Sequence, residues 1–271
     1  MAIKVDIDKL ISEYKKGGHK TNFPDSLKKV LEYARTDKNL TDVSDLAYLL
    51  ATAKIESDYS LQRWEADFSC GLQGKPYKDK PCDSALNYYR STKDGKLNYY
   101  TLGTDKNGLP YFGRGLIQLT GKSNYQKYGD LIGVDLVNDG DKALEPKNSY
   151  LIASSFLSNK RGGIYEKNGV KRNTFDLARD NDLSLARKSV NGGTKKLSEV
   201  NTAYGFWKNL LKKNDAKVVS GSDTGGKSNT RLWLGIGLSV ITIGVTGTLI
   251  YMYLKKNNKL PNFIKNIKLK K

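Results

Sequence analysis

An uncharged apolar segment toward the C-terminal end is the feature that most limits how this chain can fold. Residues 232–254, LWLGIGLSVITIGVTGTLIYMYL, contain 23 residues without a charge. As a helix this segment would be about 35 Å long, enough to cross the hydrocarbon core of a bilayer. Trp233 lies near one end and Tyr251 and Tyr253 near the other, where aromatic side chains meet lipid headgroups. The sequence therefore predicts a transmembrane helix over residues 231–254; a buried core helix is the alternative.

The flanking segments predict how such a helix would be connected. Residues 215–230, DAKVVSGSDTGGKSNT, are rich in Gly and Ser and predict a flexible linker after a domain formed by residues 1–214. Residues 255–271 carry seven lysines with apolar side chains between them, which suits either an interfacial segment or a solvated tail. The lysine tail favours a cytoplasmic end, but residues 1–214 begin without a signal peptide, so the topology stays open.

Composition narrows the classes of partner and site. The net charge is +18, of which residues 1–214 contribute +10. Such a charge favours nucleic acid, anionic lipid or an acidic polymer such as a bacterial cell wall. One histidine excludes a multi-histidine metal site, and we expect neither a metal nor a cofactor. Two cysteines, Cys70 and Cys82, exclude a disulfide scaffold and leave one bridge or two free thiols open.

The pattern of residues 1–214 is mostly helical. Asp42 and Asp45 after Thr41 mark a helix start, and Leu46 and later apolar residues at helical spacing mark one buried face. Residues 26–33, 146–158 and 197–211 predict further helices. Residues 68–110 are rich in Gly, Lys, Asp and Tyr and include the turn signals at 94–95 and 107–108. We therefore expect a mainly α domain with a small loop-and-hairpin lobe.

Two glutamates are candidates for acid and base chemistry. Glu56 ends the helix that begins after Thr41, close to its buried face and just before a break, a partly desolvated position that suits a general acid. Glu65 follows nine residues later, on the opposite face of a continuous helix, so the two converge only if the chain turns at residues 58–60. Two carboxylates across a cleft are the minimum for glycoside hydrolysis, whereas two solvated surface groups are the alternative.

Residues 111–128, YFGRGLIQLTGKSNYQKY, place polar and aromatic side chains between glycines. Such glycines let the backbone approach a ligand, and the amide and hydroxyl groups suit a sugar rich in hydroxyls and acetamides. A glycine-bounded buried strand is the other interpretation, with Ile117 and Leu119 on one side and Gln118 and Thr120 on the other. The two interpretations are compatible.

Three motifs together resemble a known family. GRGLIQLTGKSNY resembles a motif of family 19 glycoside hydrolases, the chitinase group that also contains many bacteriophage endolysins. AYLLATAKIES resembles the helix that carries the family's general-acid glutamate, and SVNGG, residues 189–193, resembles its Asn-Gly-Gly element in the substrate cleft. The motifs occur in the family's order and cover about residues 42–211.

The resemblance implies a two-lobed, lysozyme-like fold and an inverting cleavage of β-1,4 links between N-acetylated sugars. Glu56 would protonate the leaving oxygen, Glu65 would activate water, and Thr120 would help to position that water. An inverting mechanism needs the two carboxyl groups about 6.5–9.5 Å apart. The substrate-binding residues implied in this way are Arg114, Gln118, Asn124, Tyr125 and Asn191.

The chain departs from the family pattern at several positions. Ile55 stands where phage-type members usually have histidine before the acid. The residues after Glu65 are ADFS in place of the frequent Asn-Leu-Asn-Tyr run, which makes Asp67 an alternative to Glu65. Lys195 and Lys196 follow the Asn-Gly-Gly element in place of small polar residues.

These features together predict a membrane-anchored peptidoglycan hydrolase of phage type, a component of a lipid-containing virion. Its partners would be peptidoglycan glycan strands, a lipid membrane through residues 232–254, and virion capsid proteins, with no nucleic acid. It would be a single-pass protein of the virion membrane or the host inner membrane. The alternatives are a chitinase or a lytic transglycosylase on the same fold, and a non-catalytic wall-binding structural protein of the virion.

Overall fold

The computed structural model describes residues 2–64, 92–93, 96–97 and 103–219. All of them belong to the first of two units, Met1–Gly225. Within these ranges no helix is both long enough and apolar enough to cross a membrane. Several predictions lie outside the described residues: the transmembrane helix, the basic tail, Glu65, Asp67, and the pair Cys70 and Cys82.

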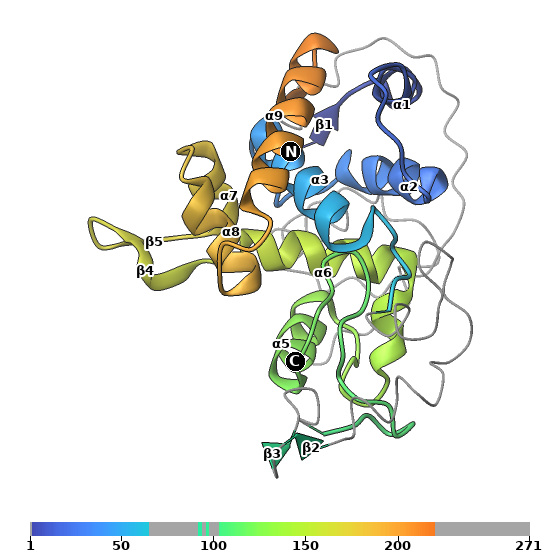
Figure 1. The fold of residues 1–271 in the computed structure, drawn as a ribbon, viewed down its shortest axis with the longest axis vertical. Helices are drawn as coiled ribbons and strands as arrows, with labels where there is room; N and C mark the ends of the chain where they lie inside the picture. The colour runs from blue at the N-terminus through green and yellow to red at the C-terminus, as the bar shows by residue number, and fades with distance from the viewer. Residues whose placement is uncertain (1, 65–91, 94–95, 98–102, 220–271) are drawn as a thin grey trace, which may run out of the picture. The chain divides into compact units, whose positions relative to one another are not determined.

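The described part is mainly helical, as the sequence predicts (Figure 1). Its helices are α1 Ile7–Lys16, α2 Pro24–Ala34, α3 Val43–Ser57, α5 Lys122–Ile132, α6 Pro146–Ser158, α7 Thr174–Arg179, α8 Leu183–Asn191 and α9 Leu197–Lys213, with a 3-10 helix at Gly140–Leu144. The strands form three antiparallel pairs: β1 Ala2–Lys4 with β6 Lys217–Val219, β2 Thr92–Lys93 with β3 Lys96–Leu97, and β4 Arg161–Lys167 with β5 Val170–Arg172. The β2–β3 pair flanks the predicted turn at residues 94–95.

Helix α3 runs through the core and carries Glu56 in its last turn. Its start is a capping box. The side chain of Asp42 accepts a hydrogen bond from a backbone N–H of the first turn, and the side chain of Asp45 accepts one from the backbone N–H of Asp42. Residues 45–53 are all buried, because α9, α6 and α7 pack around the helix. The prediction of one buried face was therefore too narrow: α3 is surrounded by protein, which fixes the position of its C-terminal turn.

The two ends of the described domain meet in the β1–β6 pair. Ile3 pairs with Val218 and is buried, so these β-branched residues form a strand pair although they are distant in the chain. Asn214 Nδ2 also donates to Glu13 Oε2 on α1 at 3.1 Å. The predicted linker, residues 215–230, overlaps β6. The linker boundary is therefore corrected: the folded domain continues through Val219.

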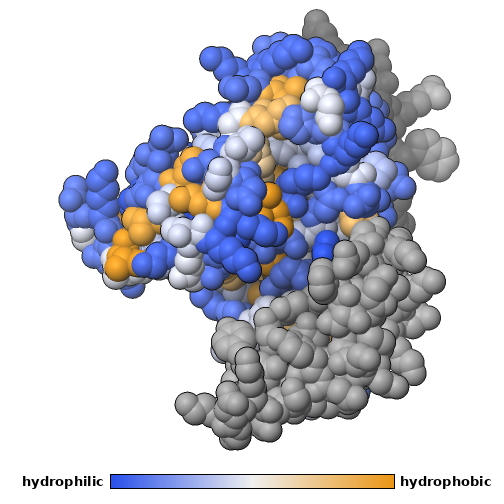
Figure 2. All heavy atoms as spheres, in the orientation of Figure 1, coloured by the Kyte–Doolittle hydropathy of each residue, from blue (hydrophilic) through white to orange (hydrophobic). Residues whose placement is uncertain are grey.

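A β-hairpin that the sequence analysis did not predict extends from the helices beside α7 and α8 (Figure 1). Asn168 and Gly169 form its turn with φ of 53° and 75°, the left-handed values that a tight two-residue hairpin turn requires. Figure 2 shows an apolar patch on this hairpin, and other apolar areas on the helical body in the same view. Arg161 begins β4 and anchors the hairpin to the helical body, since its guanidinium donates to the carbonyl of Ser189 on α8.

Candidate functional site

A cavity of about 660 Å³ brings together residues from all three sequence motifs. It lies where the end of α3, the loop before α5, the start of α5 and the segment after α8 meet. The predicted site residues on its lining are Glu56, Gln118, Thr120, Asn124 and Asn191. These residues are up to 135 positions apart in the chain, so their convergence is a property of the fold.

Glu56 is held in this cavity by a buried arginine. Its side chain is 19% exposed and forms an ion pair with Arg187 of α8, whose side chain is 3% exposed. Arg187 Nη1 donates to Glu56 Oε1, and Arg187 Nε donates to the carbonyl of Lys195 at 2.8 Å. The carboxyl group is therefore fixed in orientation at the cavity wall. The sequence analysis missed Arg187; the available signal was an arginine four residues before Asn191 on the same helix.

The chain turns sharply directly after α3, as the convergence of two carboxylates would require. Asp58 and Tyr59 have φ of 53° and 67°, and Lys54 Nζ contacts Asp58 Oδ1 at 2.5 Å. The turn at residues 58–60, which was the condition for the two carboxylates to converge, is therefore present. The described chain then continues to Trp64, which is buried, and Glu65 lies just beyond it.

The loop before α5 forms a tight turn, so the alternative interpretation of this segment as a buried strand was wrong. Arg114 and Leu119 exchange two backbone hydrogen bonds of 3.0 and 3.2 Å across the turn. Gly115 and Gln118 both have left-handed φ, 74° and 56°, which a strand does not allow. A Cβ at Gly115 would lie 2.6 Å from Ser149 Oγ, so this position has room only for glycine. The prediction that the apolar side chains of the loop belong to the core is confirmed.

The polar side chains of this loop are fixed through their donor groups. Gln118 Nε2 donates to the carbonyls of Gly115 at 2.9 Å and Arg63 at 3.1 Å. Thr120 Oγ1 donates to the carbonyl of Gln118, and Asn124 Nδ2 donates to that of Thr120. The amide oxygens of Gln118 and Asn124 form no hydrogen bond within the described ranges. They can therefore accept from the N–H and O–H groups of a sugar.

Arg114 and Tyr125 lie in the core, and neither is on the cavity lining, contrary to their predicted role as substrate-binding residues. Arg114 is ion-paired with Asp141 at 2.8 Å, donates to Tyr125 Oη at 2.9 Å, and its guanidinium lies 4.0 Å from the ring centre of Phe112. Tyr125 Oη donates to the carbonyl of Phe112 at 2.6 Å. Both side chains therefore connect the loop to the buried interior of the domain.

The segment after α8 closes the other side of the cavity. Asn191 is the last residue of α8; its Oδ1 accepts from Gly193 N at 3.0 Å and its Nδ2 donates to the carbonyl of Lys195 at 3.3 Å. Lys195 and Lys196, the two departures from the family pattern, both line the cavity. With Arg187 they place three cations on the described part of the lining, where Glu56 is the one carboxylate. The field in this cavity therefore favours an anionic ligand.

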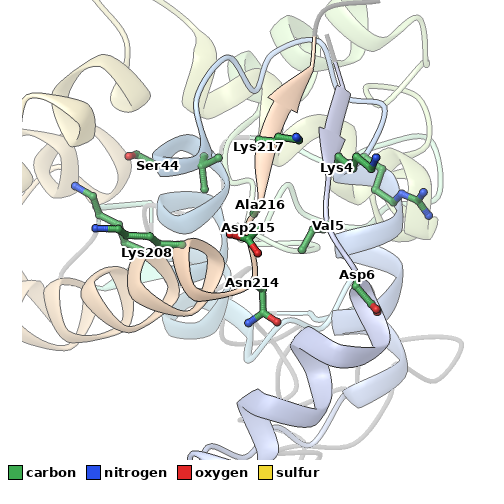
Figure 3. A pocket seen from close by; sticks show the side chains of 12 residues that line it. Lys4, Val5, Asp6, Ser44, Lys208, Asn214, Asp215, Ala216 and Lys217 are labelled. Carbon is green, nitrogen blue, oxygen red and sulfur yellow. The ribbon is translucent and has the colours of Figure 1, made fainter. Parts of the chain in front are cut away.

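A larger cavity of about 950 Å³ lies elsewhere on the domain, between β1, β6 and the end of α9 (Figure 3). Lys4, Lys208 and Lys217 line it, together with Asp6, which caps α1 by accepting from Lys9 N. None of the predicted site residues that the structure describes lies on this cavity. Its carboxylates serve the local fold or are open to solvent, so we assign the candidate site to the smaller cavity.

Comparison with known proteins finds similarity to chitinases, which are glycoside hydrolases. Residues 79–158 match the family model described as chitinase class I, of glycoside hydrolase family 19. Over 32 residues the chain is 66% identical to chitinase 11 and 62% identical to chitinase 8 of Oryza sativa subsp. japonica, covering 12% of this chain and 12% of each relative. The chain thus spans about an eighth of the length of these curated relatives.

Two solved structures show a looser likeness. Chitinase C from Streptomyces griseus is 16% identical, with a TM-score of 0.44 over 76% of this chain and 90% of that one. A bacterial family 19 chitinase is 18% identical, with a TM-score of 0.42 over 76% of this chain and 92% of that one. The family match includes Gln118, Thr120 and Asn124, whereas Glu56 and Asn191 lie outside it. The family match and the curated relatives support a glycoside hydrolase, as the sequence predicts.

Proposed function

We propose that this protein hydrolyses β-1,4 glycosidic bonds in the glycan strands of bacterial peptidoglycan, with Glu56 as the general acid. The observation that carries the proposal is the cavity whose lining contains Glu56, fixed by the buried Arg187, together with the amide side chains of Gln118 and Asn124. An oriented carboxyl group beside sugar-binding amides is the arrangement that proton transfer to a glycosidic oxygen requires.

In the proposed reaction the proton of the Glu56 carboxyl group passes to the glycosidic oxygen as the C1–O bond breaks. A water molecule attacks C1 from the opposite face, and its proton passes to a second carboxylate, for which Glu65 is the candidate and Asp67 the alternative. Thr120, which lines the cavity, would help to hold that water. The product would have an inverted anomeric centre, because a single displacement takes place.

The charge of the cavity supports peptidoglycan as the substrate. Chitin is an uncharged polymer, whereas peptidoglycan carries carboxylates on its peptide stems. Among the described residues, Arg187, Lys195 and Lys196 line the cavity and Glu56 is the acidic side chain on it, so this part of the lining attracts an anionic polymer more strongly than a neutral one. A chitinase activity is the second candidate, because the family description and the matched rice proteins are chitinases.

A membrane location is part of the same proposal. The uncharged segment 232–254 would anchor the chain, and the lysine-rich residues 255–271 would contact anionic headgroups. An enzyme held at a membrane cuts the wall locally, which suits a phage protein of a lipid-containing virion during entry or release. Detection of the protein and of its activity in purified particles would support this role, and particles that lack the protein would refute it.

The products distinguish the candidate reactions. The full chain is incubated with purified sacculi and, in parallel, with chitin, and the released ends are analysed by reducing-sugar assay and mass spectrometry. Reducing ends from sacculi in excess of those from chitin are the expected result. Products with 1,6-anhydro ends would show a lytic transglycosylase, and binding to sacculi without release of sugars would show a non-catalytic wall-binding protein.

A further inference from the structure

A second cavity, of about 460 Å³, continues the candidate site along α8. The two cavities share Asn124, Phe156, Val190 and Gly192 on their linings. The second cavity is bounded by α5, the end of α6, the first strand of the β4–β5 hairpin, and α8. A polymer bound at Glu56 therefore has a neighbouring space into which its substituents can extend.

The charges on this second cavity are all positive. Among the residues that the structure describes, its lining carries Lys127, Lys160, Arg161 and Lys188 and no acidic side chain. None of the four forms an ion pair with any residue of the described ranges, whereas the cations at 172, 179 and 187 each pair with a carboxylate. Four cations on one cavity lining without ion pairs among the described residues make the local potential positive, and a positive potential attracts an anion. We call these four residues the basic subsite.

Arg161 adds an observation that does not depend on charge alone. Its guanidinium packs 4.7 Å from the ring centre of Phe156, and its Nη1 donates to the carbonyl of Ser189. Its Nε is buried and has no hydrogen-bond partner within the described ranges. A buried donor without an acceptor costs free energy, so such a group beside a cavity is where a ligand oxygen is expected.

We propose that the basic subsite binds anionic substituents of the wall glycan while the sugar backbone lies at Glu56. This inference rests on the proposed function and deepens it, because it names the residues that select a charged glycan over chitin. The ligand chemistry is an oxyanion. Its two sources in a bacterial wall are the carboxylates of the peptide stems and the phosphates of attached secondary polymers.

Binding without cleavage isolates this step. All variants are made in the full chain with Glu56→Gln, and binding to sacculi is measured by co-sedimentation at low and high salt. The subsite variant is Lys127→Gln with Lys160→Gln and Lys188→Gln. The matched control removes three exposed lysines from the larger cavity of Figure 3, Lys208→Gln, Lys212→Gln and Lys217→Gln, so that the net charge changes equally.

An exposed ion pair contributes about a 1.5- to 5-fold effect on affinity, so the subsite variant should bind sacculi about tenfold more weakly. The control variant should bind sacculi with an affinity close to that of the parent. High salt should remove the difference in affinity between the subsite variant and the parent. Two treated substrates identify the source of the anion. Sacculi whose carboxylates are blocked by carbodiimide coupling to ethanolamine test the peptide stems, and sacculi treated with hydrofluoric acid test the phosphates.

Loss of the parent's advantage over the subsite variant on either treated substrate would support the proposal and name the anion. Equal binding by the subsite variant and the control on untreated sacculi would overturn it. This failure is distinguishable from failure of the proposed function, which is measured separately as reducing ends released by the chain that retains Glu56. If the chain releases reducing ends but the subsite variant binds sacculi as the control does, the proposed hydrolase activity stands and the proposed basic subsite is refuted.

Discussion

Replacement of Arg114 decides between two roles for a residue that both the sequence and the structure single out. The motif resemblance implies that Arg114 binds substrate, whereas the structure buries its side chain completely and pairs it with Asp141 at 2.8 Å. It also donates to the carbonyl of Pro110 at 3.0 Å and to Tyr125 Oη at 2.9 Å. We therefore expect Arg114→Met to destabilise the fold rather than to weaken substrate binding in a folded protein.

The size of this effect follows from the burial of the two partners. Removing one member of a buried ion pair costs about 3–5 kcal/mol, because the remaining charge is left without its partner. The side chain of Asp141 is 26% exposed, so water reaches it and the cost lies near the lower end, about 3 kcal/mol. For a domain of this size about 1 kcal/mol corresponds to about 2–4 °C in Tm, so Tm should fall by about 6–12 °C.

Thermal unfolding of the full chain, followed by circular dichroism, measures this change. Lys28→Met is the matched control, because it breaks an ion pair with Asp8 whose side chains are 46% and 82% exposed. Water screens such an exposed pair, so it contributes little to stability and the control should keep its Tm within about 3 °C. An Arg114→Met protein with an unchanged Tm and a raised KM would refute the structural role and restore the binding role.

Three further predictions concern the loop before α5, the stability of the domain at low pH, and the orientation of the Glu56 carboxyl group. Gly115→Ala should destabilise the domain by at least about 2 kcal/mol, seen in denaturant unfolding, because φ is 74° and the new Cβ would lie 2.6 Å from Ser149 Oγ. The hydrogen bond from Asn214 lowers the pKa of Glu13 below its ordinary value of 4.5. The stabilisation from Glu13 is therefore present above pH 4.5 and is lost as the pH falls through the lower folded-state pKa, so Glu13→Gln should flatten the fall of Tm with acidification. Arg187→Leu should lower kcat by about a hundredfold with a smaller change in KM, because it releases the carboxyl group from its fixed orientation; an unchanged kcat would contradict the positioning role.

The long helices could be predicted from the sequence because their information is local. Residues 146–158 match α6, and residues 197–211 fall within α9, since a helix repeats its apolar pattern every turn. Asp42 and Asp45 mark the start of α3 through its capping box. The β1–β6 pair could not be predicted, because its strands are more than 200 residues apart and each is only three residues long.

The candidate site could be predicted where a motif itself carries the chemistry. Glu56, Gln118, Thr120, Asn124 and Asn191 were identified from three separate motifs, and the fold brings all five to one cavity. The sequence did not show which of the polar side chains are buried in the core and which line the cavity. Arg114 stands within a motif yet lies in the core, whereas Arg187 stands outside the motifs and contacts Glu56. Both outcomes depend on packing between elements distant in the chain.

The central claim is that Glu56 is the general acid of a glycoside hydrolase, and a single substitution tests it. The release of reducing ends from sacculi is measured for the full chain, for Glu56→Gln and for Glu32→Gln, which makes the same chemical change at an exposed position. We predict that Glu56→Gln reduces release by at least about a hundredfold while it still binds sacculi, and that Glu32→Gln retains full release. Undiminished release by Glu56→Gln would contradict the account.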